Sequence, residues 1–236
     1  MIITSKTDFL EGQTLLFDKS LYWTSFDLVK KVKNIIRKHY GYKKIKVGHA
    51  GTLDPLASGL MIICTGKNTK KISDLQGLDK EYVATFRFGE TTPSFDLETG
   101  VDATFPTSHI SRESILSALD HFIGEQDQVP PLFSAKRVDG KRAYEYARKG
   151  QERELNSAKI WFYELELLKY DMPSATIRIK SSKGTYIRSF ARDLGQYLDS
   201  GAHLVKLKRT KIGTFDLADA YRLEGFENEL NILQQI

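Results

Sequence analysis

The chain has 236 residues, of which 41% are hydrophobic and 28% are charged, so it can bury one large core or two smaller ones. This composition excludes a disordered chain, a collagen and a coiled-coil rod. The mean hydropathy is -0.36, and no apolar run approaches the roughly 18 residues of a membrane span. The single cysteine, Cys64, excludes an internal disulfide framework and a multi-cysteine zinc site. Since the N-terminus also lacks the pattern of a secretion signal, we expect a cytoplasmic protein that does not associate with membranes.

Positive charge is concentrated in parts of the sequence. Lysine and arginine number 35 against 30 aspartates and glutamates, a formal net charge of +5. The basic residues gather at 30–46, 136–153 and 206–211, whereas the residues after Gly213 are acidic. Solvated faces of ordinary helices would account for such clusters. A polyanionic partner such as nucleic acid would account for them too, because local lysine and arginine fields bind phosphate by releasing counterions.

The first elements in the chain are a strand and a helix. Residues 13–18 form a short apolar run typical of a strand. The helix that follows is capped by Thr24 or Ser25 and ends at Gly41. Its apolar side chains recur at helical spacing, and we expect these to point inward: Phe26, Val29, Val32, Ile35 and Ile36.

A glycine-rich segment comes next. Three glycines and a proline predict a loop over 48–59, and a buried strand follows at 60–65. Alternating side chains predict another strand at 80–89. A helix starts at Ser111, with these side chains expected to point inward: Ile115, Leu116, Leu119, Phe122 and Ile123.

The second half of the chain begins with an irregular segment. Residues 125–155 are basic, carry aromatic side chains and hold only one short helical pattern, so we predict an inserted arm there. Paired strands follow at 159–170 and 174–182. A helix is then expected at 187–198 and a strand at 204–212.

The order of these elements favours an α+β fold. Strands outnumber helices and are often joined directly, which indicates a mixed, mainly antiparallel sheet flanked by helices rather than a doubly wound parallel sheet. We find no internal repeat and no interdomain linker. The sequence therefore predicts one domain over residues 1–236.

Several cofactor motifs are missing from the sequence. It has no phosphate-binding P-loop, no dinucleotide fingerprint, no H-E-x-x-H zinc motif and no G-x-S-x-G nucleophile elbow. The five histidines form no pair at metal-ligand spacing. We therefore expect a reaction that needs neither a cofactor nor a metal.

The segment over 48–59 carries one carboxylate, Asp54. Pro55 fixes its own φ and biases Asp54 toward an extended backbone. A carboxylate on a rigid, glycine-flanked loop before a buried strand is suitably placed to act as a nucleophile or base. Asp-Pro also begins ordinary turns, and an isolated His49 is more often structural than catalytic.

The whole string over 48–60, GHAGTLDPLASGL, closely resembles the catalytic signature of the TruB-type tRNA pseudouridine synthases. The resemblance covers roughly residues 13–213 in collinear order, through the segments KEY (80–82), DLETG (96–100), PLFSAK (131–136), GKRAY (140–144), SKGTYIRS (182–189), GAHL (201–204) and LKRT (207–210). It implies a pseudouridine-synthase-like fold with an RNA-binding arm. It also implies the isomerisation of uridine to pseudouridine at position 55, in the T-loop of tRNA, without a cofactor.

The resemblance also assigns catalytic roles. Asp54 is the nucleophile and attacks a flipped-out nucleotide, either at uracil C6 or at ribose C1′. Tyr82 stacks on the uracil and assists proton removal from C5. Arg188 pairs with the catalytic carboxylate and holds it ionised.

Binding residues follow by the same resemblance. His49 supports the disrupted T-loop stack, and Asp96 contacts flipped-out nucleotides. Tyr186 and Leu207 line the nucleotide pocket; without the resemblance, Tyr82, Tyr186 and Leu207 would be interpreted as packing residues. The arm, with the lysine-rich segment 30–46, grips the RNA, and the arm residues expected to do so are Lys136, Arg142 and Lys149.

The chain departs from the family pattern in three places. It carries Lys19-Ser20-Leu21-Tyr22 where relatives usually have Lys-Pro-x-Gly, and Thr92-Pro93 where they often have Thr-Asp. Many relatives append a C-terminal RNA-binding (PUA) domain, and the 23 residues after Gly213 are too few for one. We therefore expect a short, monomeric form that needs no protein partner and recognises the T-arm with its catalytic domain.

Two other classes stay open. A non-catalytic RNA-binding protein could use the same fold and surface, although the intact Asp54, Tyr82 and Arg188 argue against it. A carboxylate-dependent hydrolase would need a second acidic residue, and the loop itself carries only Asp54.

Overall fold

The computed structural model describes residues 3–4, 7–134, 136–138, 140–147, 151, 153 and 155–233. Its contacts divide the chain into two compact units. The first unit holds residues 1–81 and 208–236, and the second holds residues 82–207. Two strands contribute to both units: β4 (Lys80–Phe88) and β12 (Ala202–Ile212). The single domain that the sequence predicts stays a prediction.

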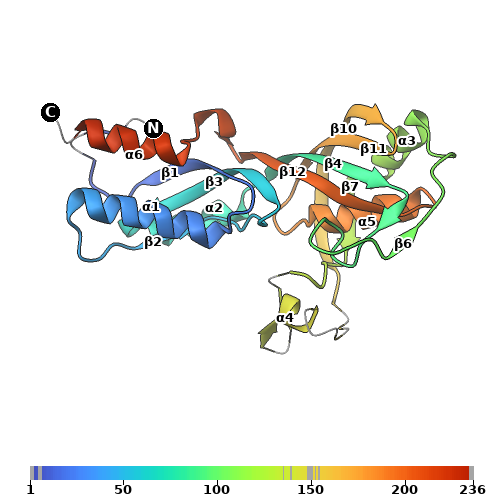
Figure 1. Cartoon of the computed structure of the whole chain (residues 1–236), viewed down its shortest axis with the longest axis horizontal. Helices are drawn as coiled ribbons and strands as arrows, with labels where there is room; N and C mark the ends of the chain where they lie inside the picture. Colours follow the sequence, from blue (N-terminus) through green and yellow to red (C-terminus); the bar gives the residue numbers. More distant parts are fainter. Residues whose placement is uncertain are drawn as a thin grey trace. The chain divides into compact units, whose positions relative to one another are not determined.

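In the first unit, β3 is the central strand (Figure 1). β1 pairs with it antiparallel, with Thr14 opposite Cys64, and β12 lies on its other side. β2 also pairs with β3 antiparallel. Besides its share of β4 and β12, the unit contains β1 (Thr14–Lys19), α1 (Ser25–Tyr40), β2 (Val47–His49), β3 (Ala57–Thr65), η1 (Gly66–Lys71), α2 (Ile72–Gly77), β13 (Phe215–Asp216), η2 (Leu217–Asp219) and α6 (Leu223–Leu233).

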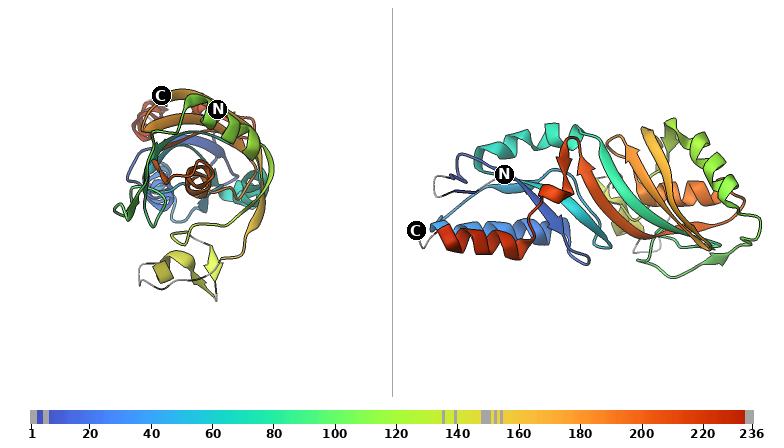
Figure 2. Two further views of the ribbon diagram at one scale, coloured as in Figure 1. Left: turned by 90° about the vertical axis from the view of Figure 1, so that its right-hand side faces the viewer. Right: turned by 90° about the horizontal axis from the view of Figure 1, so that it is seen from above.

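Helices cover both faces of this part of the sheet. Leu60 and Ile62 pack on one face with side chains of α2. On the other face Phe17 lies opposite Met61, and its ring is 5.1 Å from that of Phe226 in α6. α6 also contacts α1, and the right-hand view of Figure 2 shows these two helices side by side. Because β3 is covered on both faces, its sequence is a continuous apolar run rather than an alternating one.

α1 has the two ends that the sequence predicts. The Thr24 hydroxyl accepts a hydrogen bond from the backbone of Asp27, and the helix stops at Gly41, which has a φ of 67°. The inward position predicted for Phe26 is wrong, because its side chain is 69% exposed. Phe26 precedes Lys30 and Lys33 by four and seven residues, so it shares their face of the helix.

The second unit is built on the strand order β12-β4-β11-β10-β7. β10 pairs antiparallel with both β11 and β7. Besides its share of β4 and β12, the unit contains β5 (Glu90–Thr91), β6 (Ala103–Thr104), α3 (Arg112–Phe122), β7 (Gly124–Gln128), β8 (Arg137–Val138), β9 (Lys141–Arg142), α4 (Ala143–Ala147), β10 (Ala158–Asp171), β11 (Ser174–Ser181) and α5 (Ile187–Tyr197).

An aromatic cluster holds α5 and α3 on this sheet. The Phe190 ring of α5 lies 5.7 Å from Phe86 in β4 and 4.8 Å from Phe162 in β10. It also lies 5.3 Å from Phe122 in α3. All four side chains are buried. The contacts of Phe190 with Phe86 and Phe122 are edge-on, and such contacts add to the free energy gained by burying the rings.

The fold class is confirmed: helices flank a mixed, mainly antiparallel sheet. The loop predicted over 48–59 is wrong at both ends, since its first two residues belong to β2 and its last three to β3. The irregular segment predicted from 125 starts later, because residues 125–128 belong to β7. Their side chains are all polar, so the strand shows no hydrophobic alternation and is stabilised by backbone pairing with β10. Ile123 is exposed rather than inward, because the backbone is extended there, directly after α3 ends.

Candidate active site

The loop that carries Asp54 occupies residues 50–56, between β2 and β3. Its backbone is tied at both ends. The Ala50 N–H donates to the carbonyl oxygen of Ile62 at 2.9 Å. The Ala57 N–H donates to the carbonyl of Asp54 at 3.0 Å, which closes a turn around Pro55. The half-buried Asp54 side chain therefore projects from a short, closed loop.

The start of α1 holds the residue before Asp54. The Ser25 hydroxyl accepts from the Leu53 N–H at 2.9 Å and donates to the Leu53 carbonyl at 3.0 Å. Both residues are buried. The two bonds pair both backbone polar groups of Leu53. They therefore restrict the backbone from which Asp54 projects.

A buried arginine on β12 holds the other side of the loop. Arg209 is 1% exposed, and its Nε donates to the carbonyl of Leu60 at 2.8 Å. Its Nη1 donates to the carbonyl of Thr52 at 3.3 Å, and its Nη2 donates to the carbonyl of Gly51 at 3.2 Å. One guanidinium thus links β12 to β3 and to the loop before Asp54.

Gly59 makes this strand contact possible. A Cβ at this position would lie 2.3 Å from the carbonyl oxygen of Arg209, and the φ of Gly59 is +107°. Only glycine satisfies both conditions at low cost, which explains a glycine inside an otherwise apolar buried strand.

Lys19, the last residue of β1, is a buried cation in the neighbourhood of Asp54. It is 1% exposed, and its Nζ donates to the carbonyl oxygens of Ser20 and Trp23 at 3.0 and 2.6 Å. Burial lowers the pKa of Lys19 to about 8, an effect that the Asp54 carboxylate opposes. The pKa of Lys19 therefore depends on the charge of Asp54.

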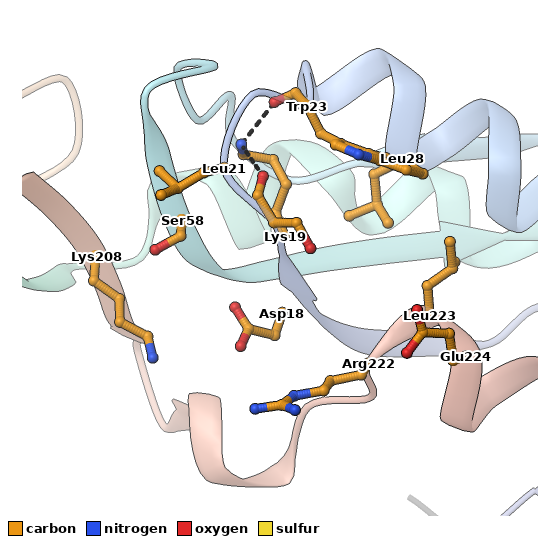
Figure 3. Close-up of a pocket in the computed structure, with 11 residues that line it drawn as sticks. Asp18, Lys19, Leu21, Trp23, Leu28, Ser58, Lys208, Arg222, Leu223 and Glu224 are labelled. Atoms are coloured by element: carbon orange, nitrogen blue, oxygen red, sulfur yellow. Dashed lines mark hydrogen bonds between the residues drawn. The ribbon is translucent and has the colours of Figure 1, made fainter. Parts of the chain in front are cut away.

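A pocket of about 480 Å³ opens beside Lys19 (Figure 3). Figure 3 shows the side chains of Lys208 and Arg222 extending toward Asp18, while the Lys19 amino group turns toward Trp23. Ser58, next to Gly59 on β3, also lines it. Three cationic and two acidic side chains line the pocket, so its formal charge is only slightly positive: Lys19, Lys208 and Arg222 against Asp18 and Glu224.

In the second unit, Arg188 at the start of α5 forms a buried ion pair. Its Nε lies 3.6 Å from Oδ2 of Asp96, and its Nη1 donates to the carbonyl of Phe133 at 2.9 Å. Asp96 is fixed in turn, since its Oδ1 accepts from the Ser94 hydroxyl at 2.6 Å and from the Glu98 N–H at 2.9 Å. The resemblance pairs Arg188 with Asp54, and that pairing stays a prediction.

Of the remaining predicted residues of the second unit, two lie on strands and one directly precedes a helix. Tyr82 is a buried residue of β4, and Leu207 is a half-buried residue of β12. Tyr186 is the half-buried residue before α5. Its backbone N–H donates to Oε1 of Gln128 at 2.8 Å, and its carbonyl accepts from Nε2 of the same side chain at 3.2 Å.

His49 lies in the first unit with Asp54, on β2. It is half-buried, and burial lowers the pKa of its imidazole. The ring is therefore neutral at pH 7, which suits packing against a nucleobase better than contact with a phosphate.

The arm residues are described in part. The Lys136 amino group donates to the carbonyl of Asn156 at 2.8 Å. Arg142 lies in β9, opposite Arg137 of β8 in a two-stranded hairpin. Lys149 lies outside the described residues. Nearby, the guanidinium of Arg153 lies 4.9 Å from the ring centre of Tyr146.

Sequence reasoning missed two residues that hold the Asp54 loop, Ser25 and Arg209, and it missed the buried cation Lys19 in the neighbourhood of Asp54. It counted Arg209 in the basic cluster 206–211, yet this side chain is buried and does not belong to a solvent-facing surface. Strand alternation was the available signal, because Lys206 and Lys208 are exposed, whereas Leu207 is half-buried and Arg209 is buried. No local signal distinguished Lys19 or Ser25.

The described residues hold no cluster of three histidine, cysteine, aspartate or glutamate side chains that could bind a metal ion. In this part of the chain, we also find no helix with the length and apolar character needed to cross a membrane.

Two family models match the chain. Residues 37–187 match the TruB family pseudouridylate synthase (N terminal domain), and residues 188–235 match the tRNA pseudouridylate synthase B C-terminal domain. The chain is 55% identical over 224 residues to "tRNA pseudouridine synthase B" of Phocaeicola vulgatus, covering 95% of both chains. It is 52% identical over 224 residues to the protein of the same name from Flavobacterium johnsoniae, covering 94% of this chain and 98% of the relative.

Solved structures show the same fold. A chain of the archaeal box H/ACA sRNP Nop10–Cbf5 complex is similar with a TM-score of 0.71 and 22% identity, over 98% of this chain and 58% of that one. A Cbf5–Nop10–Gar1 complex gives a TM-score of 0.71 and 26% identity, over 96% of this chain and 56% of that one. Together with the family models, these likenesses define the class: the chain is a pseudouridine synthase, an isomerase that makes pseudouridine. Within that class, it belongs to the TruB family.

Proposed function

We propose that this enzyme converts uridine to pseudouridine at position 55, in the T-loop of tRNA, with Asp54 as the nucleophile acting on a flipped-out nucleotide. The names of its relatives support tRNA as the substrate. The observation that carries the proposal is the loop of Asp54: Ser25 and Arg209 hold it through five hydrogen bonds to its backbone and to β3. Such preorganisation is what a nucleophile needs, since it removes the cost of orienting the reacting atom.

The reaction is an isomerisation and needs no electrons from outside. An oxygen of Asp54 forms a bond to uracil C6 or to ribose C1′, and the bond between C1′ and N1 breaks. The uracil rotates, a bond forms between C1′ and C5, the C5 proton leaves, and N1 gains a proton. The carboxylate leaves unchanged at the end, so it acts as a covalent catalyst that adds and departs.

In this proposal, the side chains that contact the target nucleotide and the one that pairs with Asp54 belong to the second unit. Tyr82 stacks on the uracil and assists loss of the C5 proton, while Tyr186 and Leu207 line the nucleotide pocket. Arg188 pairs with the catalytic carboxylate, and its buried contact with Asp96 supports this role because it limits the positions of the guanidinium.

RNA recognition completes the proposal. His49 supports the T-loop stack after the base has left it, and Asp96 contacts a flipped-out nucleotide. Lys136, Arg142 and Lys149 on the arm bind the RNA backbone, so that phosphate contacts position the substrate while loop shape and the extruded base provide selectivity.

The test is release of tritium from an unmodified tRNA transcript labelled at C5 of uridine, without metal ions or nucleotides. We expect release, with pseudouridine mapped to position 55, and its loss to background in Asp54→Asn. The matched control is Asp74→Asn, which removes an exposed carboxylate from α2 of the same unit and should leave the rate unchanged.

Each other result contradicts part of the proposal. Activity retained in Asp54→Asn would show that Asp54 is not the nucleophile. Pseudouridine at another position would contradict the T-loop assignment. RNA cleavage or loss of the base favours the hydrolase. Tight binding without tritium release favours the non-catalytic RNA-binding protein.

A further inference from the structure

Gln128, the last residue of β7, is a buried amide in the second unit. The other residues of β7 are half-buried or exposed, whereas Gln128 is 4% exposed. Burying an amide is costly unless its polar atoms are paired. Both atoms pair with Tyr186, since Oε1 accepts from the Tyr186 N–H at 2.8 Å and Nε2 donates to the Tyr186 carbonyl at 3.2 Å. One side chain therefore holds the peptide groups on both sides of Tyr186.

These two bonds lie at the start of α5. Tyr186 is the N-cap residue of this helix, a position at which short side chains that accept backbone hydrogen bonds are preferred. In a capping box, the side chain at the third helical position accepts from the N-cap N–H. Here that position holds Ser189, whose hydroxyl donates to the Val129 carbonyl at 2.8 Å instead. Gln128, 58 residues away in the chain, accepts from the Tyr186 N–H in its place.

The chain directly after Gln128 is also held to α5. The Arg192 Nη2 donates to the Val129 carbonyl at 3.2 Å, and the Arg188 Nη1 donates to the Phe133 carbonyl at 2.9 Å. These bonds, with that of the Ser189 hydroxyl, tie the chain around Gln128 to the first two turns of the helix. Gln128 is therefore itself fixed, as a residue must be if it is to hold another in place.

Gln128 fixes a short segment that carries two residues of the proposed site. Tyr186 lines the nucleotide pocket in that proposal, and Arg188, two residues later, pairs with the catalytic carboxylate. The direction in which each side chain projects depends on the peptide groups beside it. Gln128 is too deeply buried to contact the RNA, so its effect on the reaction has to pass through Tyr186.

We infer that Gln128 is a positioning residue for the target nucleotide. It fixes the backbone of Tyr186, and thereby the ring of Tyr186 and the start of α5 that carries Arg188. The inference rests on the proposed function, which places Tyr186 in the nucleotide pocket. Phosphate contacts elsewhere hold the RNA, so loss of Gln128 misplaces the reacting nucleotide without releasing the tRNA. It lowers the rate rather than the affinity.

The test compares Gln128→Met with Gln126→Met. Methionine has nearly the size of glutamine but neither polar atom of the amide. Gln126 is the matched control because it lies two residues earlier on the same strand, and its Nε2 donates to the Phe122 carbonyl at 3.2 Å. That carbonyl belongs to the end of α3, which carries none of the predicted site residues. Single-turnover tritium release, dissociation constants for tRNA and urea unfolding are measured for both variants.

We expect Gln128→Met to lower the single-turnover rate at saturating tRNA about 10- to 100-fold. The dissociation constant for tRNA should change by less than about twofold. Gln126→Met should also unfold at a lower urea concentration than the original protein, because it loses its own bond to a helix end. Its rate and its affinity for tRNA should stay those of the original enzyme.

Gln128→Glu provides a second variant in case Gln128→Met does not fold. Its carboxyl group keeps an oxygen that accepts from the Tyr186 N–H, but its ionised form has no proton to donate to the Tyr186 carbonyl. We expect a rate about 3- to 10-fold below that of the original enzyme, again with unchanged affinity. Hydrogen exchange of the Tyr186 amide, followed by NMR, should be slow in the original protein and in Gln128→Glu, and faster in Gln128→Met.

An unchanged rate in both Gln128 variants would overturn the inference. Equal losses of rate in Gln128→Met and Gln126→Met would overturn it too, because they would show a general effect of destabilisation. A loss of tRNA affinity that accounts for the lost activity would assign Gln128 to binding instead of positioning. Failure of the proposed function appears in another readout, since the original enzyme would then form no pseudouridine at position 55, whereas exchange of the Tyr186 amide would still report the contact with Gln128.

Discussion

The hydroxyl of Ser25 and the backbone of Leu53 exchange two hydrogen bonds, with the hydroxyl accepting from one peptide group and donating to the other. A residue at the start of α1 thereby fixes the peptide groups on either side of the residue before Asp54. The first turn of a helix is rigid. Its contact with α1, rather than the sequence of the loop itself, therefore fixes the position of the loop. Removing this one oxygen should loosen the nucleophile without changing its chemistry.

We predict that Ser25→Ala lowers the free energy of unfolding by about 1–3 kcal/mol, because it leaves buried polar groups of Leu53 unsatisfied. The single-turnover rate should fall roughly 10- to 100-fold through displacement of Asp54. Ser73→Ala, at an exposed position of α2, is the matched control for both measurements. Urea unfolding and tritium release at saturating tRNA provide the two values. An active, fully stable Ser25→Ala protein would show that the loop positions itself.

Arg209 and Lys208 are adjacent on β12 but face opposite ways, since Arg209 is buried and Lys208 is exposed. A lysine at position 209 cannot reproduce three hydrogen bonds to carbonyls of two segments. We therefore expect Arg209→Lys to lower the free energy of unfolding by about 1.5–3 kcal/mol. Lys208→Ala should leave stability within about 0.5 kcal/mol. Denaturant unfolding of both variants is the measurement. Similar losses of unfolding free energy in the two variants would contradict the distinction between the buried and exposed faces of β12.

The buried pair of Asp96 and Arg188 allows a variant of nearly constant shape. Asp96→Asn keeps an oxygen that accepts from Ser94 and Glu98 but removes the charge opposite Arg188. Because a buried guanidinium then lacks its partner, we expect a loss of about 3–5 kcal/mol in stability. The rate should fall with it, if Arg188 acts on the catalytic carboxylate as proposed. Asp102→Asn, on the exposed surface of the same unit, should change neither stability nor rate.

The lowered pKa of Lys19 predicts a pH dependence of stability. Between about pH 8 and pH 10.5 the unfolded chain holds a proton on Lys19 that the folded chain has lost. Unfolding therefore takes up a proton, and the stability of the original protein rises with pH through this window relative to Lys19→Met. The full difference is about 3 kcal/mol, with no change below pH 8. Parallel stability curves for the two proteins across this window would contradict the prediction.

The charge of Asp54 should also influence the pKa of Lys19. The Asp54 carboxylate opposes the effect of burial, so Asp54→Asn should move the pKa of Lys19 below about 8. Carbon-13 NMR of the lysine side chain measures this in both proteins and does not require a Lys19 variant to fold. A pKa that rises or stays constant would show that the two charges are not coupled.

For the arm, we predict that Arg142→Ala weakens tRNA binding with little effect on the rate at saturating substrate, because phosphate contacts position the RNA without taking part in the reaction. Lys149→Ala should behave in the same way. Filter binding at moderate salt and single-turnover tritium release separate affinity from chemistry. Unchanged tRNA affinity in both variants would show that Arg142 and Lys149 do not contact the RNA.

Much of the fold could be predicted from local pattern. Thr24 and Gly41 mark the ends of α1, and the pairing of β10 with β11 follows from two alternating segments around a short turn. The predictions failed where the hydrophobic pattern of a segment does not match its surroundings in the folded protein. Phe26 has helical spacing but lies on the lysine-bearing face, and β7 is a strand without an apolar residue.

By itself, the sequence determined the fold class, the family and the residue expected to act as the nucleophile, because a long collinear set of motifs carries that information. Only the tertiary structure decided that Arg209 and Lys19 are buried and that Ser25 holds the Asp54 loop. Leu60 and Arg209 are 149 residues apart in the chain, and they meet because Gly59 lets two strands approach closely. Whether a charged side chain is buried depends on which segments fold over it, and local pattern does not record that.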